Sequence, residues 1–309
     1  MRLYILKRIA ETIPVFLIIV SAVFFMVRFV PGGPFDKERT VSKETLERVN
    51  AYYGLDKPLY EQYFAFLKNL AKGELGPSYK YPGWNVGEIL KEKAAVSLQL
   101  GAAALAIALI AGMSAGVAAA AFPKGKLGAI LSFFSILGVC LPSFVLGPLL
   151  ILLFSIKLGC FNAMGWNSPG DIILPSITLA LFYSAWIARL ARGGIMREKL
   201  RPYVKTAYAK GLSPARVYLV HILRNGLEPV ISYLGPAAAG LLTGSFVVET
   251  IFQVPGLGKF FISSALDNDY TMIMGCVMLY AAFIIFFNLI SDIVLAAINP
   301  KIAKEMTKK

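Results

Sequence analysis

Long apolar runs separated by shorter polar stretches dominate this 309-residue chain. A helix of roughly 20 apolar residues crosses the hydrocarbon core of a bilayer, which is about 30 Å thick. Six runs approach or exceed that length, and they cover 9–30, 97–121, 129–156, 172–187, 230–252 and 272–298. The pattern therefore predicts an all-α integral membrane protein with six transmembrane helices. The fourth run is the shortest, and we expect its helix to continue towards Arg189.

The first run predicts a retained membrane span, although its basic start resembles a signal peptide. Its apolar stretch is longer than the apolar region of a typical signal peptide, and "FVPGGP" follows without a small-x-small cleavage site. We expect four parts: a cytosolic start with the first span, an extracytoplasmic segment, a core of five spans with a cytosolic region at 189–226, and a cytosolic tail. Their bounds are 1–30, 31–96, 97–299 and 300–309.

The net charge of +13 is distributed in the way that membrane topology predicts. The segments expected in the cytosol are 1–8, 123–128, 189–226 and 299–309, and they hold most of the 31 basic residues but few acidic ones. The outer segment mixes both signs almost evenly. Since cytosolic loops are enriched in Lys and Arg, this asymmetry predicts cytosolic termini and explains the excess charge without a nucleic-acid partner.

The outer segment 31–96 is too long for a simple connection, so we expect it to fold or to serve a function. "SKETLERVNAYYG" predicts a short helix from the N-cap Ser42 to Gly54. "PLYEQYFAFLKNLAKG" predicts a second helix from Pro58 to Gly73. Their apolar stripes need cover from each other, from the outer ends of the spans, or from a partner.

Small residues are concentrated in the second and fifth spans. Gly112 and Gly116 form a G-x-x-x-G pattern, and Gly235, Gly240 and Gly244 repeat the theme in the fifth span. Small residues allow membrane helices to approach closely. They could equally line a path that opens for cargo, and the sequence leaves both interpretations open.

Ionisable residues within the spans are few, and they lie away from the expected midplane. Glu11 and Arg28 are near the ends of the first span, Glu249 is late in the fifth, and Asp292 is in the sixth. Ion-coupled transporters usually hold such residues at mid-membrane. The energy for any transport is therefore expected from outside the membrane domain, with Glu249 and Asp292 in helix-end or helix–helix hydrogen bonds.

Catalytic and cofactor chemistry is not indicated. Cys140 and Cys276 lie in predicted spans and Cys160 in an outer loop, so we expect no disulfide framework. His221 is the single histidine and cannot form a histidine-based metal site. There is no G-x-x-x-x-G-K-[ST] phosphate loop, so the chain itself is expected neither to bind nor to hydrolyse ATP.

The stretch "YVKTAYAKGLSPARVYLVHILRNGLEP" at 203–229 is basic and amphipathic, unlike its surroundings. A first short helix should carry Val204, Ala207 and Tyr208 on one stripe and end at Gly211. A second should start at the N-cap Ser213 and Pro214, with Leu212 packed on Val217, and continue to Gly226. We call this helix–Gly–helix segment, 203–226, the elbow.

Three interpretations of the elbow compete. A DNA-reading helix-turn-helix is disfavoured because both ends join membrane spans within a few residues. A helix adsorbed on anionic lipid needs an amphipathic stripe but no capped break. The break therefore favours docking to a cytosolic partner, through Lys205, Thr206, Ala207, Ala209, Lys210, Gly211, Leu212, Ser213, Pro214 and Arg216.

The elbow resembles the "EAA" loop of the membrane subunits of binding-protein-dependent ABC importers of the oligopeptide/dipeptide class. Lys205, Thr206 and Ala207 take the E-A-A positions and Gly211 the glycine that follows three residues later. The general pattern would place I-x-L-P at 221–224, where this chain has "HILR", a departure usual in the peptide/nickel branch. "RFVPGGPFDKERT", "GPAAAGLLTGSFVVETIFQVPGLGKFF", "ALDNDY" and "INPKI" extend the similarity along the whole chain.

The resemblance implies the type I importer permease fold in the inner membrane, without catalytic activity in this chain. It also implies a second homologous permease subunit, two P-loop ATPase subunits that bind ATP and Mg²⁺, an extracytoplasmic peptide-binding protein and surrounding membrane lipid. The elbow would couple ATPase motion to alternating access, and the outer segment would contact the binding protein.

Oligopeptides are the implied cargo, while dipeptides, nickel, glutathione and oligosaccharides stay open. An ion-coupled secondary transporter is the more distant alternative. A membrane-bound enzyme and a non-transporting scaffold are disfavoured, the first because no acid–base pair, nucleophile–base pair or metal cluster is evident.

Overall fold

The computed structural model describes residues 2–29, 51, 54–81 and 83–298. This part of the chain is built from helices, and its only β feature is an isolated antiparallel bridge between Pro77 and Asn85. The all-α expectation is therefore confirmed for the described residues.

Five helical segments of the described chain are long and apolar enough to cross a membrane. They are α1 (Arg2–Phe29), α4 (Val86–Ala121), the 3-10 turn η2 (Pro169–Ile172) with α7 (Ile173–Lys199), α11 (Glu228–Leu242) with α12 (Phe246–Ile251), and α14 (Tyr270–Ile298). A sixth is broken, and it consists of α5 (Lys126–Cys140), then α6 (Ser143–Leu150) with the π-helical turn η1 (Ile151–Lys157). The six predicted spans are recovered when this bent pair counts as one.

The third run is not one straight helix, because its two halves are bent by 108° at Leu141 and Pro142. Proline has no N–H to continue a helix and disfavours helical geometry in the residue before it. Leu141 accordingly adopts an extended conformation, with φ −81° and ψ 114°.

Two helices extend beyond their apolar runs. Helix α4 begins at Val86 rather than near residue 97, because the Asn85 side chain caps it by accepting a hydrogen bond of 3.0 Å from the Gly87 amide. Helix α7 reaches Lys199, so the fourth run does not give the shortest span. Its last turns are polar on one face but bury Ala188, Ala191 and Ile195 on the other, a pattern that hydropathy alone does not detect.

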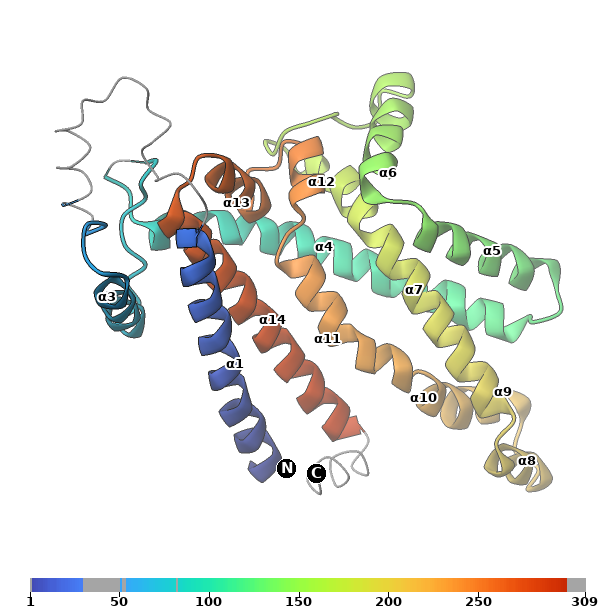
Figure 1. Ribbon diagram of the computed structural model, residues 1–309. Helices are drawn as coiled ribbons and strands as arrows, with labels where there is room; N and C mark the ends of the chain where they lie inside the picture. The colour runs from blue at the N-terminus through green and yellow to red at the C-terminus, as the bar shows by residue number, and fades with distance from the viewer. Residues whose placement is uncertain (1, 30–50, 52–53, 82, 299–309) are drawn as a thin grey trace.

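Helices α4 and α7 pack along each other at the centre of the molecule (Figure 1). A methyl group at Gly112 would lie 2.6 Å from the Ser184 carbonyl oxygen, and one at Gly116 would lie 2.6 Å from that of Ala188. The G-x-x-x-G pattern of the second span thus permits close helix packing, one of its two open interpretations.

The remaining spans surround this pair. Helix α5 packs on α7, α11 contacts both α4 and α14, and α1 lies along α14. Figure 1 shows the start of α1, the end of α14 and the elbow on one side, and α12 and α13 (Leu257–Leu266) on the other. Arg8 of α1 donates to Asp292 of α14 at 2.7 Å, so Asp292 has the helix–helix partner that the sequence predicted.

The outer helix α3 (Leu59–Ala71) obtains its cover from the spans. Tyr63, Phe66 and Leu67 pack against a cluster that contains Phe24 of α1 and Met274 of α14. The predicted helix at 42–54 lies outside the described residues except at Ala51 and Gly54, which are joined by a backbone hydrogen bond of 3.1 Å.

Candidate functional site

The first half of the elbow is helix α8 (Pro202–Ala209). Arg201 precedes it in an extended conformation, and Pro202 occupies its first turn, where the missing N–H costs nothing. Val204 and Ala207 are buried as the stripe predicted, while Tyr208 is 47% exposed. One side of α8 therefore faces the protein and the other faces outwards.

Gly211 ends α8 in the left-handed conformation, with φ +78°. The Gly211 amide donates to the Tyr208 carbonyl at 2.9 Å, and the Leu212 amide donates to that of Ala207 at 3.3 Å. These two bonds form a Schellman motif, in which a glycine closes the helix and the next residue packs back on it. The predicted break at Gly211 is confirmed in position and conformation.

The second half begins at Ser213 and Pro214, as predicted, but the Ser213 side chain makes no capping hydrogen bond. Its carbonyl oxygen instead accepts from the Val217 amide at 3.0 Å. The expected single helix consists of α9 (Pro214–Arg216), the π-helical η3 (Val217–Ile222) and α10 (Leu223–Gly226). The π turns were not predicted, and turns of this kind occur frequently at functional sites.

An apolar cluster fixes the elbow to the ends of two membrane helices. Its buried members are Ala120 of α4, Ile195 of α7, Val204 and Ala207 of α8, and Val217 and Ile222 of η3. Leu212 packs against the same cluster, of which Val217, its predicted staple partner, is a member. The elbow, the end of α4 and the last turns of α7 therefore share one packed core.

Polar contacts strengthen this attachment. The Lys199 ammonium donates to the Ala120 carbonyl at 2.5 Å, and the Tyr218 hydroxyl donates to that of Val117 at 3.3 Å. Tyr203 donates to the Glu198 carboxylate at 2.6 Å and accepts from the Asn225 side chain at 3.0 Å. Partial burial raises the pKa of Tyr203, and the Glu198 contact adds to this, so the hydroxyl keeps the proton that it donates.

Eight of the ten predicted docking residues are exposed. The exposed ones are Lys205, Thr206, Ala209, Lys210, Gly211, Ser213, Pro214 and Arg216. Ala207 is buried and Leu212 is half-buried, so these two support the elbow from within. The burial of Ala207 agrees with its place on the predicted apolar stripe, so its direct contact with a partner is not expected.

The exposed face of the elbow is basic with an apolar part. Lys205, Lys210 and Arg216 are exposed, and Leu219 is 62% exposed on the following turns. A matching partner surface would be acidic and would hold an apolar recess.

A second notable feature lies where two spans are interrupted. A cavity of about 490 Å³ is bounded by the α5–α6 break at Pro142, by α7, and by the α11–α12 junction at Gly244, whose φ is +89°. The Tyr183 hydroxyl lies so close to Gly240 that a side chain there would collide with it. Irregular backbone at membrane depth is tolerated where protein covers it or where it lines a cavity.

Glu249 is fully buried beside this junction. Its carboxylate accepts hydrogen bonds from the Ser97 hydroxyl and the Gly258 amide, both at 2.8 Å, and from the Lys259 amide at 3.3 Å. It therefore caps α13 and joins it to α4. The helix-end or helix–helix hydrogen bonding predicted for Glu249 is confirmed. The sequence did not identify α13 as the capped helix, for which "PGLGK" at 255–259 was the available signal.

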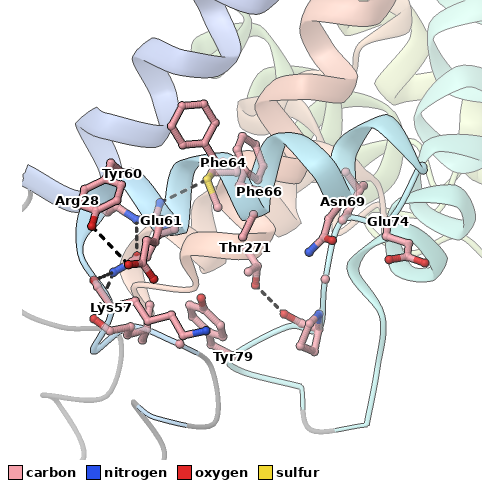
Figure 2. Close-up of a pocket in the computed structure, with 18 of the residues that line it drawn as sticks. Arg28, Lys57, Tyr60, Glu61, Phe64, Phe66, Asn69, Glu74, Tyr79 and Thr271 are labelled. Atoms are coloured by element: carbon pink, nitrogen blue, oxygen red, sulfur yellow. Dashed lines mark hydrogen bonds between the residues drawn. The ribbon is translucent and has the colours of Figure 1, made fainter.

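A pocket of about 680 Å³ lies between α3, the end of α1 and the start of α14 (Figure 2). Arg28 lies over the Phe24 ring, 3.6 Å from its centre, and donates to the Gln62 side chain at 3.0 Å. Thr271 of α14 donates to the Pro77 carbonyl at 2.8 Å, as Figure 2 shows.

Asp269, just before α14, completes the attachment of the outer segment. Its carboxylate is buried and accepts from the Ser78 hydroxyl and from the Tyr79 and Lys80 amides. The segment beyond α3 is thereby fixed to the sixth span, whose first turn Asp269 also caps through the Met272 amide.

Comparison with known proteins identifies relatives along the whole chain. The family described as "Binding-protein-dependent transport system inner membrane component" matches 81–304, and its N-terminal counterpart matches 1–90. The chain is 43% identical to "Oligopeptide transport system permease protein OppB" of Haemophilus influenzae, over 97% of this chain and 98% of that protein. It is 38% identical to "Dipeptide transport system permease protein DppB" of Bacillus subtilis, over 97% of each.

Solved structures share the fold at low sequence identity. A structure described as "Inward facing conformations of the MetNI methionine ABC transporter" superposes with a TM-score of 0.55 at 15% identity, covering 68% of this chain and 96% of that one. A "Crystal structure of an amino acid ABC transporter with histidines" gives 0.50 at 18% identity, covering 69% and 94%. The predicted importer permease fold is confirmed.

Proposed function

Because this chain belongs to the family of binding-protein-dependent transport system inner membrane components, we propose that it is the permease subunit of an ATP-driven importer of oligopeptides. It is a multi-pass inner-membrane protein, and it would form half of the translocation pathway. Near full-length identity of 42% and 43% to oligopeptide permeases is the observation that carries the choice of cargo.

The proposed complex has a second homologous permease, two P-loop ATPase subunits and an extracytoplasmic peptide-binding protein. ATP and Mg²⁺ would be bound by the ATPase subunits, and this chain would have no enzymatic activity. The positive-inside asymmetry supports cytosolic termini. Figure 1 agrees with that orientation, because the start of α1, the end of α14 and the elbow lie on the same side of the molecule.

The elbow would seat in a groove of one ATPase subunit through Lys205, Thr206, Ala209, Lys210, Gly211, Ser213, Pro214 and Arg216, held from within by Ala207 and Leu212. Closure of the ATPase dimer around ATP would then draw the two permease elbows together. Because the elbow shares an apolar cluster with α4 and α7, its displacement would move both helices as rigid bodies. Such motion converts ATP binding into alternating access.

Dipeptides are the second candidate cargo, supported by the 38% identity to a dipeptide permease. Nickel, glutathione and oligosaccharides have no comparable support. An ion-coupled mechanism is disfavoured because Asp292 pairs with Arg8 and Glu249 caps α13, so both carboxylates have structural partners.

Purification and uptake measurements test the proposal. The tagged chain should copurify with a second permease and two P-loop ATPases, and the reconstituted complex with its binding protein should import labelled oligopeptides only with ATP. Labelled dipeptides and nickel serve as competing cargoes in the same assay. Uptake by this chain alone under an ion gradient would contradict the proposal.

A further inference from the structure

A small basic cavity near the elbow has no role in the function proposed above. It measures about 230 Å³ and lies between the end of α4, the middle of α5 and the last turns of α7. Its lining includes Ala119, Ser132, Ser135, Arg189, Arg192 and Gly193.

Arg192 indicates that this cavity accommodates an acceptor. Its Nε is buried, and among the described residues no atom accepts a hydrogen bond from it. Buried guanidinium N–H groups nearly always have a partner, and arginine can only donate. The missing partner must therefore be an acceptor from outside this part of the chain.

Neither serine of the cavity accepts a hydrogen bond from the Arg192 Nε. The Ser132 and Ser135 hydroxyls donate to carbonyls of their own helix, at 2.6 Å and 2.8 Å, so the donors available to a ligand belong to the two arginines. Arg189 lies over the Trp186 ring, 5.3 Å from its centre, which holds the guanidinium while leaving its N–H edge accessible.

The charge of the cavity favours an anion. Two arginines line it, and no carboxylate does so among the residues described. Within the same residues, neither Arg189 nor Arg192 forms an ion pair. Two neighbouring guanidinium groups match the oxygens of a phosphate, which accepts hydrogen bonds from both at once.

The surroundings of the cavity favour a phosphate that carries acyl chains. Ile136 of α5 lines the cavity and is 55% exposed, and Phe133, one turn before it, is 61% exposed, so an exposed apolar surface adjoins the cavity. A side chain at Gly193 would meet no atom within 4 Å, so the cavity is open there. Lys126, exposed at the start of α5, adds a further positive charge to that helix.

We propose that Arg189 and Arg192 bind the phosphate of an anionic phospholipid, whose acyl chains lie along the exposed face of α5. Basic pockets between membrane helices on the cytosolic side are suited to such head groups. The lipid would link α5 to the end of α7, directly before the elbow.

Lipid retention by the purified complex tests this site. The complex is exchanged into nanodiscs of phosphatidylethanolamine with or without phosphatidylglycerol, released, and examined by native mass spectrometry. The variant Arg189→Gln/Arg192→Gln should retain phosphatidylglycerol at least about tenfold less than the unaltered complex. The matched control Arg197→Gln/Arg201→Gln removes two exposed charges nearby and should retain it fully.

Further arms separate the alternatives. If the double variant fails to assemble, two single variants replace it. Arg189→Gln, which alters an exposed side chain, should still lower lipid retention. Arg192→Lys should lower retention only in part, because the charge remains. Equal retention by all variants would overturn the proposal. If inorganic phosphate bound as tightly as the lipid, the lipid assignment would be overturned. If the double variant lost peptide uptake as strongly in phosphatidylethanolamine alone as with phosphatidylglycerol present, the arginines would act on the cargo instead.

Discussion

Gly211 is required for its backbone conformation and not for its small size. A side chain there would meet no atom within 4 Å, so the position has room for one. Its φ of +78° is the constraint, because residues with a Cβ adopt this region at a cost of about 1–2 kcal/mol. The sequence identified this residue correctly because a glycine that directly follows a short amphipathic helix typically ends that helix in the left-handed conformation.

Replacing Gly211 tests the docking hypothesis. Gly211→Leu should abolish peptide uptake and uncouple ATP hydrolysis from stimulation by the binding protein, because it strains the break and places a large side chain on the docking face. Gly211→Asn should retain most activity, since asparagine tolerates the left-handed region. Both would be measured in proteoliposomes, and normal uptake by Gly211→Leu would show that the elbow does not dock there.

Glu249 shows where residue-level inference from sequence is incomplete. A carboxylate in an apolar run predicts a hydrogen-bonding partner, but its partners are Ser97, 152 positions away, and two amides across a turn. Such contacts depend on how α4, α12 and α13 meet, which periodicity within one segment does not specify.

Removing the Glu249 carboxylate should destabilise the junction of α4, α12 and α13. Glu249→Ala leaves the Ser97 hydroxyl and the Gly258 amide without an acceptor, at about 1–3 kcal/mol for each buried group. We expect a melting temperature several degrees lower for the purified complex, a smaller decrease for Glu249→Gln, which keeps one acceptor oxygen, and little change for the exposed Glu92→Ala. An unchanged melting temperature for Glu249→Ala would contradict the capping role.

At the scale of elements, hydropathy predicted the existence of the spans better than their limits. Runs of apolar residues identified six spans, because lipid imposes helices about 20 residues long. The bend at Pro142 and the junction at Gly244 were not predicted, since a proline or glycine in a membrane helix can either kink it or end it. The last turns of α7 were missed because their buried face rests on protein and the other face is polar.

The packing of α4 on α7 gives a prediction for this pair of helices. In Gly116→Ala the new methyl group would lie 2.6 Å from the Ala188 carbonyl oxygen and 2.7 Å from the Ala191 methyl, so the helices must separate. Overpacking of this kind typically costs about 1–3 kcal/mol. We expect a lower melting temperature and a lower yield of assembled complex.

Gly87→Ala is the matched control in the first turn of the same helix. Its new methyl group would be 3.6 Å from the Asn85 side-chain oxygen, an ordinary contact. Equal melting temperatures for the two variants would mean that α4 and α7 accommodate the added methyl group without losing stability.

For the whole molecule, the sequence predicted the class of protein and the location of the elbow, but not the internal cavities. Charge asymmetry and the Gly211 break are properties of the chain itself, so they could be recognised without coordinates. The cavity beside Pro142 and the basic cavity at Arg192 form only where several helices meet. The elbow thus joins a surface that the local sequence predicts to a helix bundle whose packing can be described only from the three-dimensional structure.

The charge of the elbow should govern association with the ATPase subunits. The triple variant Lys205→Gln/Lys210→Gln/Arg216→Gln removes three exposed cations from the docking face. If each contributes as an exposed ion pair typically does, association should weaken by about tenfold. We expect salt to weaken copurification of the unaltered complex strongly and that of the variant much less, because screening acts on the charges that the variant lacks.

Lys68→Gln/Lys72→Gln/Lys91→Gln is the matched control, since it removes the same charge from exposed positions on α3, just after it, and in the first turns of α4. It should leave copurification and its salt dependence unchanged. If both triple variants weakened the complex equally, net charge rather than the elbow would govern assembly. If neither did, the ATPase groove would recognise the elbow by shape and apolar contact, with Leu219 and Tyr208 as the next side chains to replace.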